Sequence, residues 1–225
     1  MPPKATSAER YFTETARKIL LASLVAFYDK GLDFCEIMKV VFTNGPMELF
    51  QLIAAQKNQR AVGYIQTLAQ ENEKNIAGAT AAGLKVGVYF YSQAINAEEA
   101  AEEARFVVER LRGTNVSGPI AYDLEFYTAD EARTDDLTGE QATQNALAFC
   151  DVIRQAGYQP VVYMNLHWAG SMYGMEELAH LPVWLASYGP IPALDRGVTL
   201  WQYSESGAVD GIEGPVDLNL WFTEE

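Results

Sequence analysis

The sequence is poor in the residues that carry metal and redox chemistry. It has only two cysteines and two histidines in 225 residues. Cys35 and Cys150 are too few for a disulfide framework and form no CxxC pair; a single bridge between them stays open as the less favoured alternative. His167 and His180 stand alone in the sequence, unlike the ligands of a typical zinc site. We therefore expect no metal and no cofactor.

Basic residues are also scarce. Asp and Glu outnumber Lys and Arg by 30 to 16, giving a formal net charge of −14. A protein that binds a phosphate backbone needs clustered positive charge, so nucleic acid is not an expected partner. The acidity is otherwise consistent with simple solubility.

Long apolar runs are absent. No stretch is long enough to span a bilayer, so we expect no membrane partner. Residues 19–28 resemble the apolar part of a signal peptide, but the run begins late and follows Glu9 and Glu14. An amphipathic helix is the favoured interpretation, and export stays open.

Several catalytic signatures are missing as well. The sequence contains no G-x-G-x-x-G and no Walker loop, which weakens nucleotide-binding alternatives. It has no G-x-S-x-G elbow either, because Ser171 in the run 170–174 has the wrong position.

A regular alternation of apolar runs and capped helices is present from about residue 70 onward. Helices are expected over 71–82, from Asn96 to Gly113 and from Thr138 to Gly157, with a shorter one around 175–179. This alternation predicts βαβ units and a parallel sheet of five or six strands, which favours an α/β barrel, complete or incomplete. The expected strands are 84–91, 119–126, 160–165, 183–188, 198–203 and 216–221.

The strand expected at 119–126 carries two acids. Since side chains alternate along a strand, Asp123 and Glu125 share one face, with α-carbons about 6.6 Å apart. They lie at the carboxyl end, where parallel barrels place their catalytic groups. Two such close carboxylates disfavour double ionisation, so one pKa should be raised, as glycoside hydrolysis requires. The alternative is chance, since an Asp-x-Glu triplet is common in so acidic a chain.

The last strand and the aromatic residues extend this signal. Asp217 lies opposite the apolar face of 216–221, where it either caps a loop or supplies a third carboxylate; the residues alone leave both open. Aromatic rings near strand ends are core residues in most proteins, but they also suit the flat faces of sugars. These rings are Tyr89, Tyr91, Tyr163, Trp184, Trp201 and Tyr203.

Five runs in the same order resemble glycoside hydrolase family 25, the Chalaropsis-type lysozymes or muramidases. The runs are 82–92, 120–125, 183–188, 200–203 and 216–219. The resemblance implies an irregular, flattened barrel of the TIM-barrel type, which cleaves the β-1,4 bond between N-acetylmuramic acid and N-acetylglucosamine in peptidoglycan. It makes Glu125 the general acid, with Asp123 and Asp217 as charge-stabilising or orienting carboxylates. The substrate-binding residues implied with them are Tyr91, Tyr163, Trp184, Gln202, Tyr89 and Asn219.

The N-terminal region departs from the family pattern. The family opens with a strand Gly-Ile-Asp-Val-Ser whose acid lines the site, and the nearest counterpart is 31–35, which makes Asp33 a fourth candidate. Only 38–42 alternates like a strand, while 8–28 and 46–56 favour helices. Residues 36–69 do not follow the pattern, except that Gly63 and Tyr64 resemble the end of the family's second strand.

We therefore expect a helical extension over 1–30 and a family-25-like catalytic domain over 31–225, divergent at 31–69. The expected partner is the peptidoglycan glycan strand, acted on outside the cell or at the wall by a monomer. The alternative is a non-catalytic or inactive homologue that binds the cell wall.

Overall fold

The computed structural model of the protein describes two compact units, residues 1–78 and 79–225. A domain boundary at 30/31, expected from the sequence, stays a prediction beside this division. The described residues are 20, 22–24, 26–28, 30–43, 49, 52–53, 55–56, 74–125, 133–189, 197–212 and 214–222.

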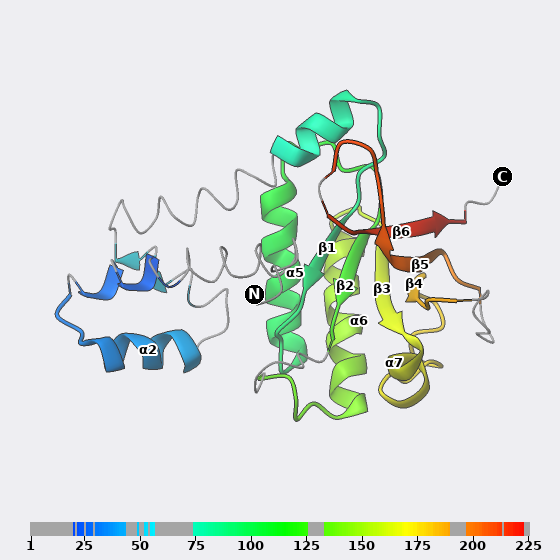
Figure 1. Ribbon diagram of the computed structural model, residues 1–225. Coiled ribbons are helices and arrows are strands. Elements are labelled where there is room, and N and C mark those ends of the chain that lie inside the picture. Colours follow the sequence, from blue (N-terminus) through cyan, green and yellow to red (C-terminus); the bar gives the residue numbers. More distant parts are fainter. Residues whose placement is uncertain are drawn as a thin grey trace, which may run out of the picture. The chain divides into compact units, whose positions relative to one another are not determined.

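The second unit is built on one six-stranded sheet, whose strands lie in the order of the sequence (Figure 1). The first five are parallel, and the sixth is antiparallel to the fifth. The sheet curls into part of a barrel, which confirms the irregular, incomplete β/α barrel. Its strands are β1 Val88–Tyr91, β2 Ile120–Asp123, β3 Pro160–Asn165, β4 Val183–Ala186, β5 Leu200–Gly207 and β6 Val216–Trp221.

Two long helices follow β1 and β2, and their ends agree with the capping signals. In α5 (Ala97–Leu111) the Asn96 side chain accepts a hydrogen bond from the Glu99 N–H. In α6 (Gly139–Gln155) Thr138 and Gln141 form a capping box. A further helix covers 74–81 and stops at Gly83, which has a φ of 79°. The predicted start of that helix, 71–73, lies outside the described residues.

One face of the sheet is covered by α5 and α6, which lie side by side (Figure 1). The strands turn their apolar side chains toward these helices: Tyr122 packs on Phe149 of α6, and Phe90 packs on both Phe149 and Phe106 of α5. Because residues alternate, Ala121 and Asp123 face the opposite side. This side of the sheet carries the candidate site.

Two features of the second unit differ from the sequence-based expectation: the position of one short helix and the direction of the last strand. The prediction of a shorter helix around 175–179 is wrong. The segment forms turns, in which the Leu178 N–H donates to the Gly174 carbonyl. A helix instead precedes it, α7 (Leu166–Ser171), whose first turn Asn165 caps through the Trp168 N–H. β6 also runs antiparallel, because the few residues between β5 and β6 are too short for a parallel crossover.

The first unit is helical where it is described. Helix α2 spans Phe34–Thr43, and residues 22–24 and 26–28 are helical as well. Residues 38–42, which alternate like a strand in the sequence, therefore belong to a helix. Ile37 is buried while Phe34 and Phe42 are exposed, so the helix has one buried side. The small core of the unit contains Ala22, Ala26, Phe27, Ile37, Leu49 and Ile53.

Among the described residues, no helix combines the length and apolarity needed to cross a membrane. Cys35 is exposed on α2 and Cys150 is buried in α6, and both are free thiols.

Candidate active site

Asp123 is the last residue of β2 and is held between two parallel neighbours. It pairs in register with Tyr91 of β1 and Tyr163 of β3. Its side chain is buried, with 7% exposed, and Oδ1 has no hydrogen-bond partner among the described residues. Burial, and then the charge of Glu125, raises the pKa of Asp123 to about 8. At neutral pH Asp123 therefore holds a proton.

Glu125 lies two residues beyond Asp123, just after the end of the strand, and is half-buried. The Tyr91 hydroxyl donates to its main-chain carbonyl at 3.4 Å. Burial raises the pKa of Glu125, the hydroxyl of Tyr163 opposes this rise, and the charge of Asp217 adds to it. The pair predicted on the sequence thus has both pKa values raised, with the stronger rise on the more deeply buried Asp123.

Gln202 of β5 connects two phenols beside these acids. Its Oε1 accepts hydrogen bonds from the hydroxyls of Tyr163 and Tyr188, each at 3.0 Å. Gln202 is 4% exposed and Tyr163 is 8% exposed, so the bond between them is sheltered from water, whereas Tyr188 is 51% exposed. The sequence did not single out Tyr188, which lies two residues after the end of β4.

An aromatic row crosses the same face of the sheet. The rings of Tyr163 and Trp184 meet edge to face with centroids 4.9 Å apart, and Tyr89 lies 6.4 Å from Trp184. The Trp184 indole N–H donates to Asn219 Oδ1 at 2.8 Å, which fixes the orientation of the ring. Tyr89 is 64% exposed and presents its ring to solvent. The row offers apolar faces with polar rims beside the acids.

Asp217 lies on β6, at the rim of this group, and is exposed. Partial burial and the neighbouring charge of Glu205 raise its pKa. Asp217 in turn adds to the rise at Glu125, so the two carboxylates interact. The structure thus groups three of the four predicted acids. The side chain of Trp201 points away from this group, and its indole N–H donates to the Ser187 carbonyl at 2.8 Å.

Asp33 belongs to the first unit and has a different environment. It precedes α2, where its Oδ1 accepts from the Glu36 N–H and its own N–H donates to Glu36 Oε2, both at 2.8 Å. This reciprocal cap begins a helix where the family pattern has a strand. Residues 31–35, the nearest counterpart of the family's first strand, therefore do not form a strand, and a catalytic role for Asp33 stays a prediction.

Within the described ranges, no group of three or more His, Cys, Asp or Glu side chains is arranged to hold a metal ion. The site is instead made of paired carboxyls, phenols, an amide and an indole. This composition on an incomplete β/α barrel defines an acid-lined, aromatic site at the carboxyl ends of parallel strands.

Comparison with known proteins identifies the family. The glycosyl hydrolases family 25 profile matches residues 53–212, and the chain belongs to this family. The matched range contains Asp123 and Glu125, whereas Asp33, Asp217 and Asn219 lie outside it.

Individual relatives agree with this assignment. The chain is 29% identical over 143 residues to the autolytic lysozyme of Clostridium acetobutylicum, an alignment that covers 63% of this chain and 41% of the lysozyme. The chain thus spans about two fifths of that relative's length.

Two solved structures are also similar. The modular autolysin LytC of Streptococcus pneumoniae, solved in complex with a synthetic peptidoglycan ligand, is 28% identical with a TM-score of 0.57, covering 68% of this chain and 37% of that one. The CTP1L endolysin is 25% identical with a TM-score of 0.54, covering 67% of this chain and 51% of that one.

Proposed function

We propose that the protein is a peptidoglycan hydrolase of the muramidase type, which cleaves the β-1,4 bond between N-acetylmuramic acid and N-acetylglucosamine at the cell wall. The observation that carries the proposal is the desolvated pair Asp123 and Glu125, beside an aromatic row suited to sugar rings. Family membership and the names of the lysozyme and endolysin relatives support it.

Glu125 is the general acid in this proposal. Its raised pKa favours the protonated form that a general acid needs, and its half-buried position leaves it reachable by substrate. It donates its proton to the glycosidic oxygen as the bond from the anomeric carbon breaks, and water then supplies the new hydroxyl. The other product leaves with a free hydroxyl where the glycosidic oxygen was.

Asp123 and Asp217 have different roles in this proposal: Asp123 orients the acetamido group, and Asp217 stabilises the positive charge that develops at the anomeric carbon. Asp123 is protonated at neutral pH, which suits a hydrogen bond that orients the acetamido group of the sugar. Asp217 is exposed and is the better candidate for an ionised carboxylate. Both a covalent intermediate and one formed by the acetamido group fit this arrangement.

The two tyrosines bonded to Gln202 and the aromatic row position the glycan strand. Tyr163 is held by Gln202 and flanks Glu125, so it links substrate binding to the acid. Trp184, fixed by Asn219, and the exposed ring of Tyr89 provide stacking surfaces. We propose that a monomer carries all these contacts and acts outside the cell.

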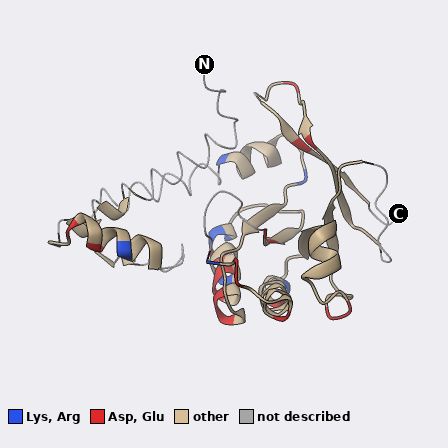
Figure 2. Ribbon diagram, turned by 60° about the horizontal axis from the view of Figure 1, so that its bottom comes forward, with Lys and Arg blue, Asp and Glu red and all other residues tan. Residues whose placement is uncertain are grey.

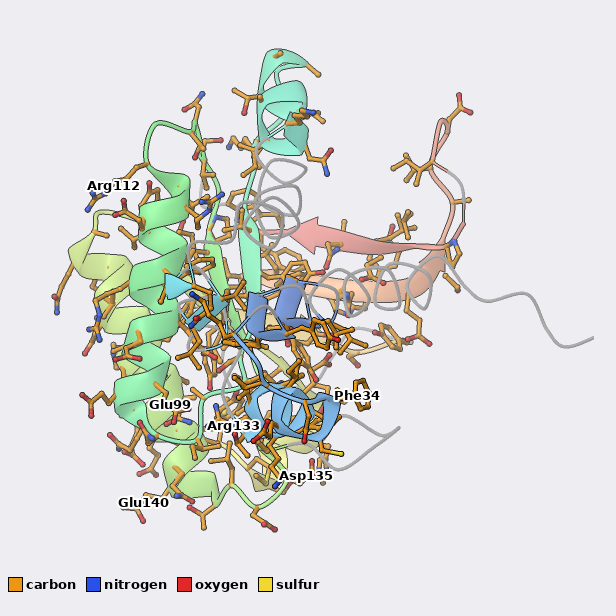
Figure 3. The ribbon with its side chains drawn as sticks, turned by 90° about the vertical axis from the view of Figure 1, so that its left-hand side faces the viewer. Phe34, Glu99, Arg112, Arg133, Asp135 and Glu140 are labelled. Atoms are coloured by element: carbon orange, nitrogen blue, oxygen red, sulfur yellow. The ribbon has the colours of Figure 1, made fainter. Side chains whose placement is uncertain are left out.

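The test is to digest purified Gram-positive cell walls and to identify the new reducing ends. Cleavage of the proposed bond leaves N-acetylmuramic acid at the reducing end, which borohydride converts to muramitol. Glu125→Gln should lower the rate by about 10²–10⁴-fold. Glu140→Gln, an exposed acid in the first turn of α6 (Figure 3), is the matched control and should retain the parent rate.

The competing candidate is a wall-binding protein without activity, and the helix found where the family places its first strand favours it. Sedimentation with cell walls and no muramitol would establish binding alone. New reducing ends of N-acetylglucosamine would contradict the proposed bond, and unchanged activity of Glu125→Gln would contradict the acid.

A further inference from the structure

Glu103 is an acid of α5 that points into the protein. Its side chain is 5% exposed, whereas the adjacent Glu102 is exposed. Figure 2 colours the acidic residues, which are frequent along this helix. The Glu103 carboxylate accepts two hydrogen bonds, from the Ser92 hydroxyl at 2.6 Å and from the Gln93 main-chain N–H at 2.9 Å. Glu103 therefore binds the segment that directly follows β1.

That segment is attached to the candidate catalytic residues. The Ser92 N–H donates to the main-chain carbonyl of Asp123 at 2.7 Å, across the last rung between β1 and β2. Tyr91, the residue before Ser92, donates from its hydroxyl to the Glu125 carbonyl. Glu103 is thus linked through the hydrogen bonds of Ser92 to the backbone of Asp123, and Tyr91, the preceding residue of the chain, bonds to the backbone of Glu125.

Two further side chains bind this stretch of the chain, the buried Asn145 and the partly exposed Arg133. Asn145 of α6 donates to the Ala94 carbonyl at 2.9 Å, and Arg133 donates to the Gln93 carbonyl at 3.1 Å. Arg133 also forms an ion pair with Glu99 at 2.9 Å, and the two lie together at one end of α5 (Figure 3). These contacts restrain the segment, but Glu103 is the buried contact that holds both Ser92 and Gln93.

A carboxyl group is an expensive choice for a buried position. Burial raises the pKa of Glu103 to about 7, the bonds from Ser92 and Gln93 oppose this rise, the charge of Glu99 adds to it and that of Arg133 opposes it. An apolar side chain would fill the space without this cost. A carboxylate instead supplies two acceptors in fixed directions, which two neighbouring donors require.

We propose that Glu103 is a positioning residue, which fixes the Ser92–Gln93 segment and thereby the placement of Asp123 relative to Glu125. The inference rests on the proposed function, because it assigns Glu103 a task in the same site. It acts through the backbone and does not touch substrate. A small misplacement of reacting groups is enough to slow a reaction by about 100-fold.

The test compares Glu103→Gln with Glu102→Gln, which removes the same charge from an exposed position one residue away. Glutamine keeps one acceptor oxygen and replaces the other with a donor, so it cannot accept from both Ser92 and Gln93. We expect kcat on cell-wall glycan to fall at least about tenfold with little change in KM. The limbs of the pH–rate profile should also shift, because the relation between Asp123 and Glu125 changes, whereas Glu102→Gln should match the parent.

A purely structural role would lower the melting temperature and leave kcat and the pH profile unchanged, and that result would overturn the proposal. If Glu103→Gln does not fold, Ser92→Ala replaces it. This variant removes one donor to Glu103 and keeps the Ser92 N–H, so we expect a smaller fall in kcat in the same direction. No fall would overturn the proposal.

A measurement without activity separates this inference from the proposed function. If the parent releases no muropeptides, the proposed function fails, and hydrogen exchange of the Ser92 amide still tests the positioning. We expect this amide to exchange at least about tenfold faster in Glu103→Gln than in Glu102→Gln, because its bond to Asp123 loses its support. Equal rates in the two variants would overturn the role of Glu103.

Discussion

The two units of the chain bury their apolar residues in different ways. In residues 79–225 the large rings of one sheet face pack under two long helices, and the opposite face is left to acids, phenols and an indole. In residues 1–78 a few helices enclose a small core, while Tyr28, Phe34 and Phe42 are largely exposed. Asp123 and Asp33 show the consequence: one is 7% exposed at a strand end, and the other is an exposed helix cap.

The difference in burial explains why the raised carboxyl pKa values occur in the second unit. Removal from water is the largest cause of the raised carboxyl pKa values in this protein, and neighbouring carboxylates add to it. The sheet does this for Asp123 and Glu125, whereas Asp33 is an exposed cap of α2.

The largest expected effect is on the core of the second unit. Phe149 is fully buried against Phe90 and Tyr122, so Phe149→Ala should lower the free energy of unfolding by about 3–5 kcal/mol. All four tryptophans lie in this unit, so tryptophan fluorescence in a denaturant titration reports on it alone. Phe42→Ala, which truncates a ring that is 78% exposed in the first unit, should leave that transition unchanged. Equal losses in both variants would break the comparison.

The next effect concerns pH. The folded pKa of Asp123 is about 8, above its ordinary value of 3.8, so the folded state keeps the proton that the unfolded state has released. Stability should therefore fall as the pH rises from about 4 to about 8. Asp123→Asn cannot ionise and should be more stable than the parent at pH 8 by roughly 2–4 kcal/mol.

Denaturant titrations at pH 4 and pH 8 check this sign. Glu103, with a folded pKa of about 7, should leave a smaller fall in Asp123→Asn between about pH 4.5 and 7. A variant that is less stable than the parent at pH 8 would show that the Asp123 carboxylate is stabilised, not strained, by its surroundings.

The smallest effect belongs to the first unit. Asp33→Ala removes the cap of α2 and should cost that helix about 1 kcal/mol, seen by hydrogen exchange of its first turn, with no change in tryptophan fluorescence. Asp33→Asn keeps a capping oxygen and should retain both the helix and the wall-digesting activity. If Asp33→Asn loses activity by 100-fold or more, the catalytic role implied by the family resemblance is correct and the first unit contributes to the site.

The sequence predicted the second unit well because local signals agree there. The caps at Asn96 and Thr138 and the turn at Gly83 mark helix ends, and the apolar runs between them are the strands. The proximity of Asp123 and Glu125 was predicted from the period of two along a strand expected over 119–126, although β2 ends at Asp123 and Glu125 follows it. The strong burial of Asp123 relative to Glu125 did not follow, because it depends on neighbours from β1 and β3 that sequence spacing does not place.

The first unit was harder to predict, because its signals conflict. Ile37, Val40 and Val41 repeat at helical spacing and pack in the core of this unit, while 38–42 alternates, and the reciprocal bonds of Asp33 and Glu36 decide in favour of the helix. In the second unit, the sequence did not predict the hydrogen bond of Tyr188 or the role proposed for Glu103. Both depend on hydrogen bonds between distant segments, to Gln202 and to Ser92, which no motif records.

The central claim is that the fold keeps the carboxyl group of Asp123 desolvated beside Glu125. A pH titration of the side-chain carboxyl carbons by NMR, with Asp123→Asn used to assign the resonance, measures this directly. The account predicts that Asp123 is still protonated at pH 7 and is half-titrated at about pH 8. A midpoint near its ordinary value of 3.8 would contradict the account, because a carboxyl group that ionises there is neither desolvated nor coupled to a neighbouring acid.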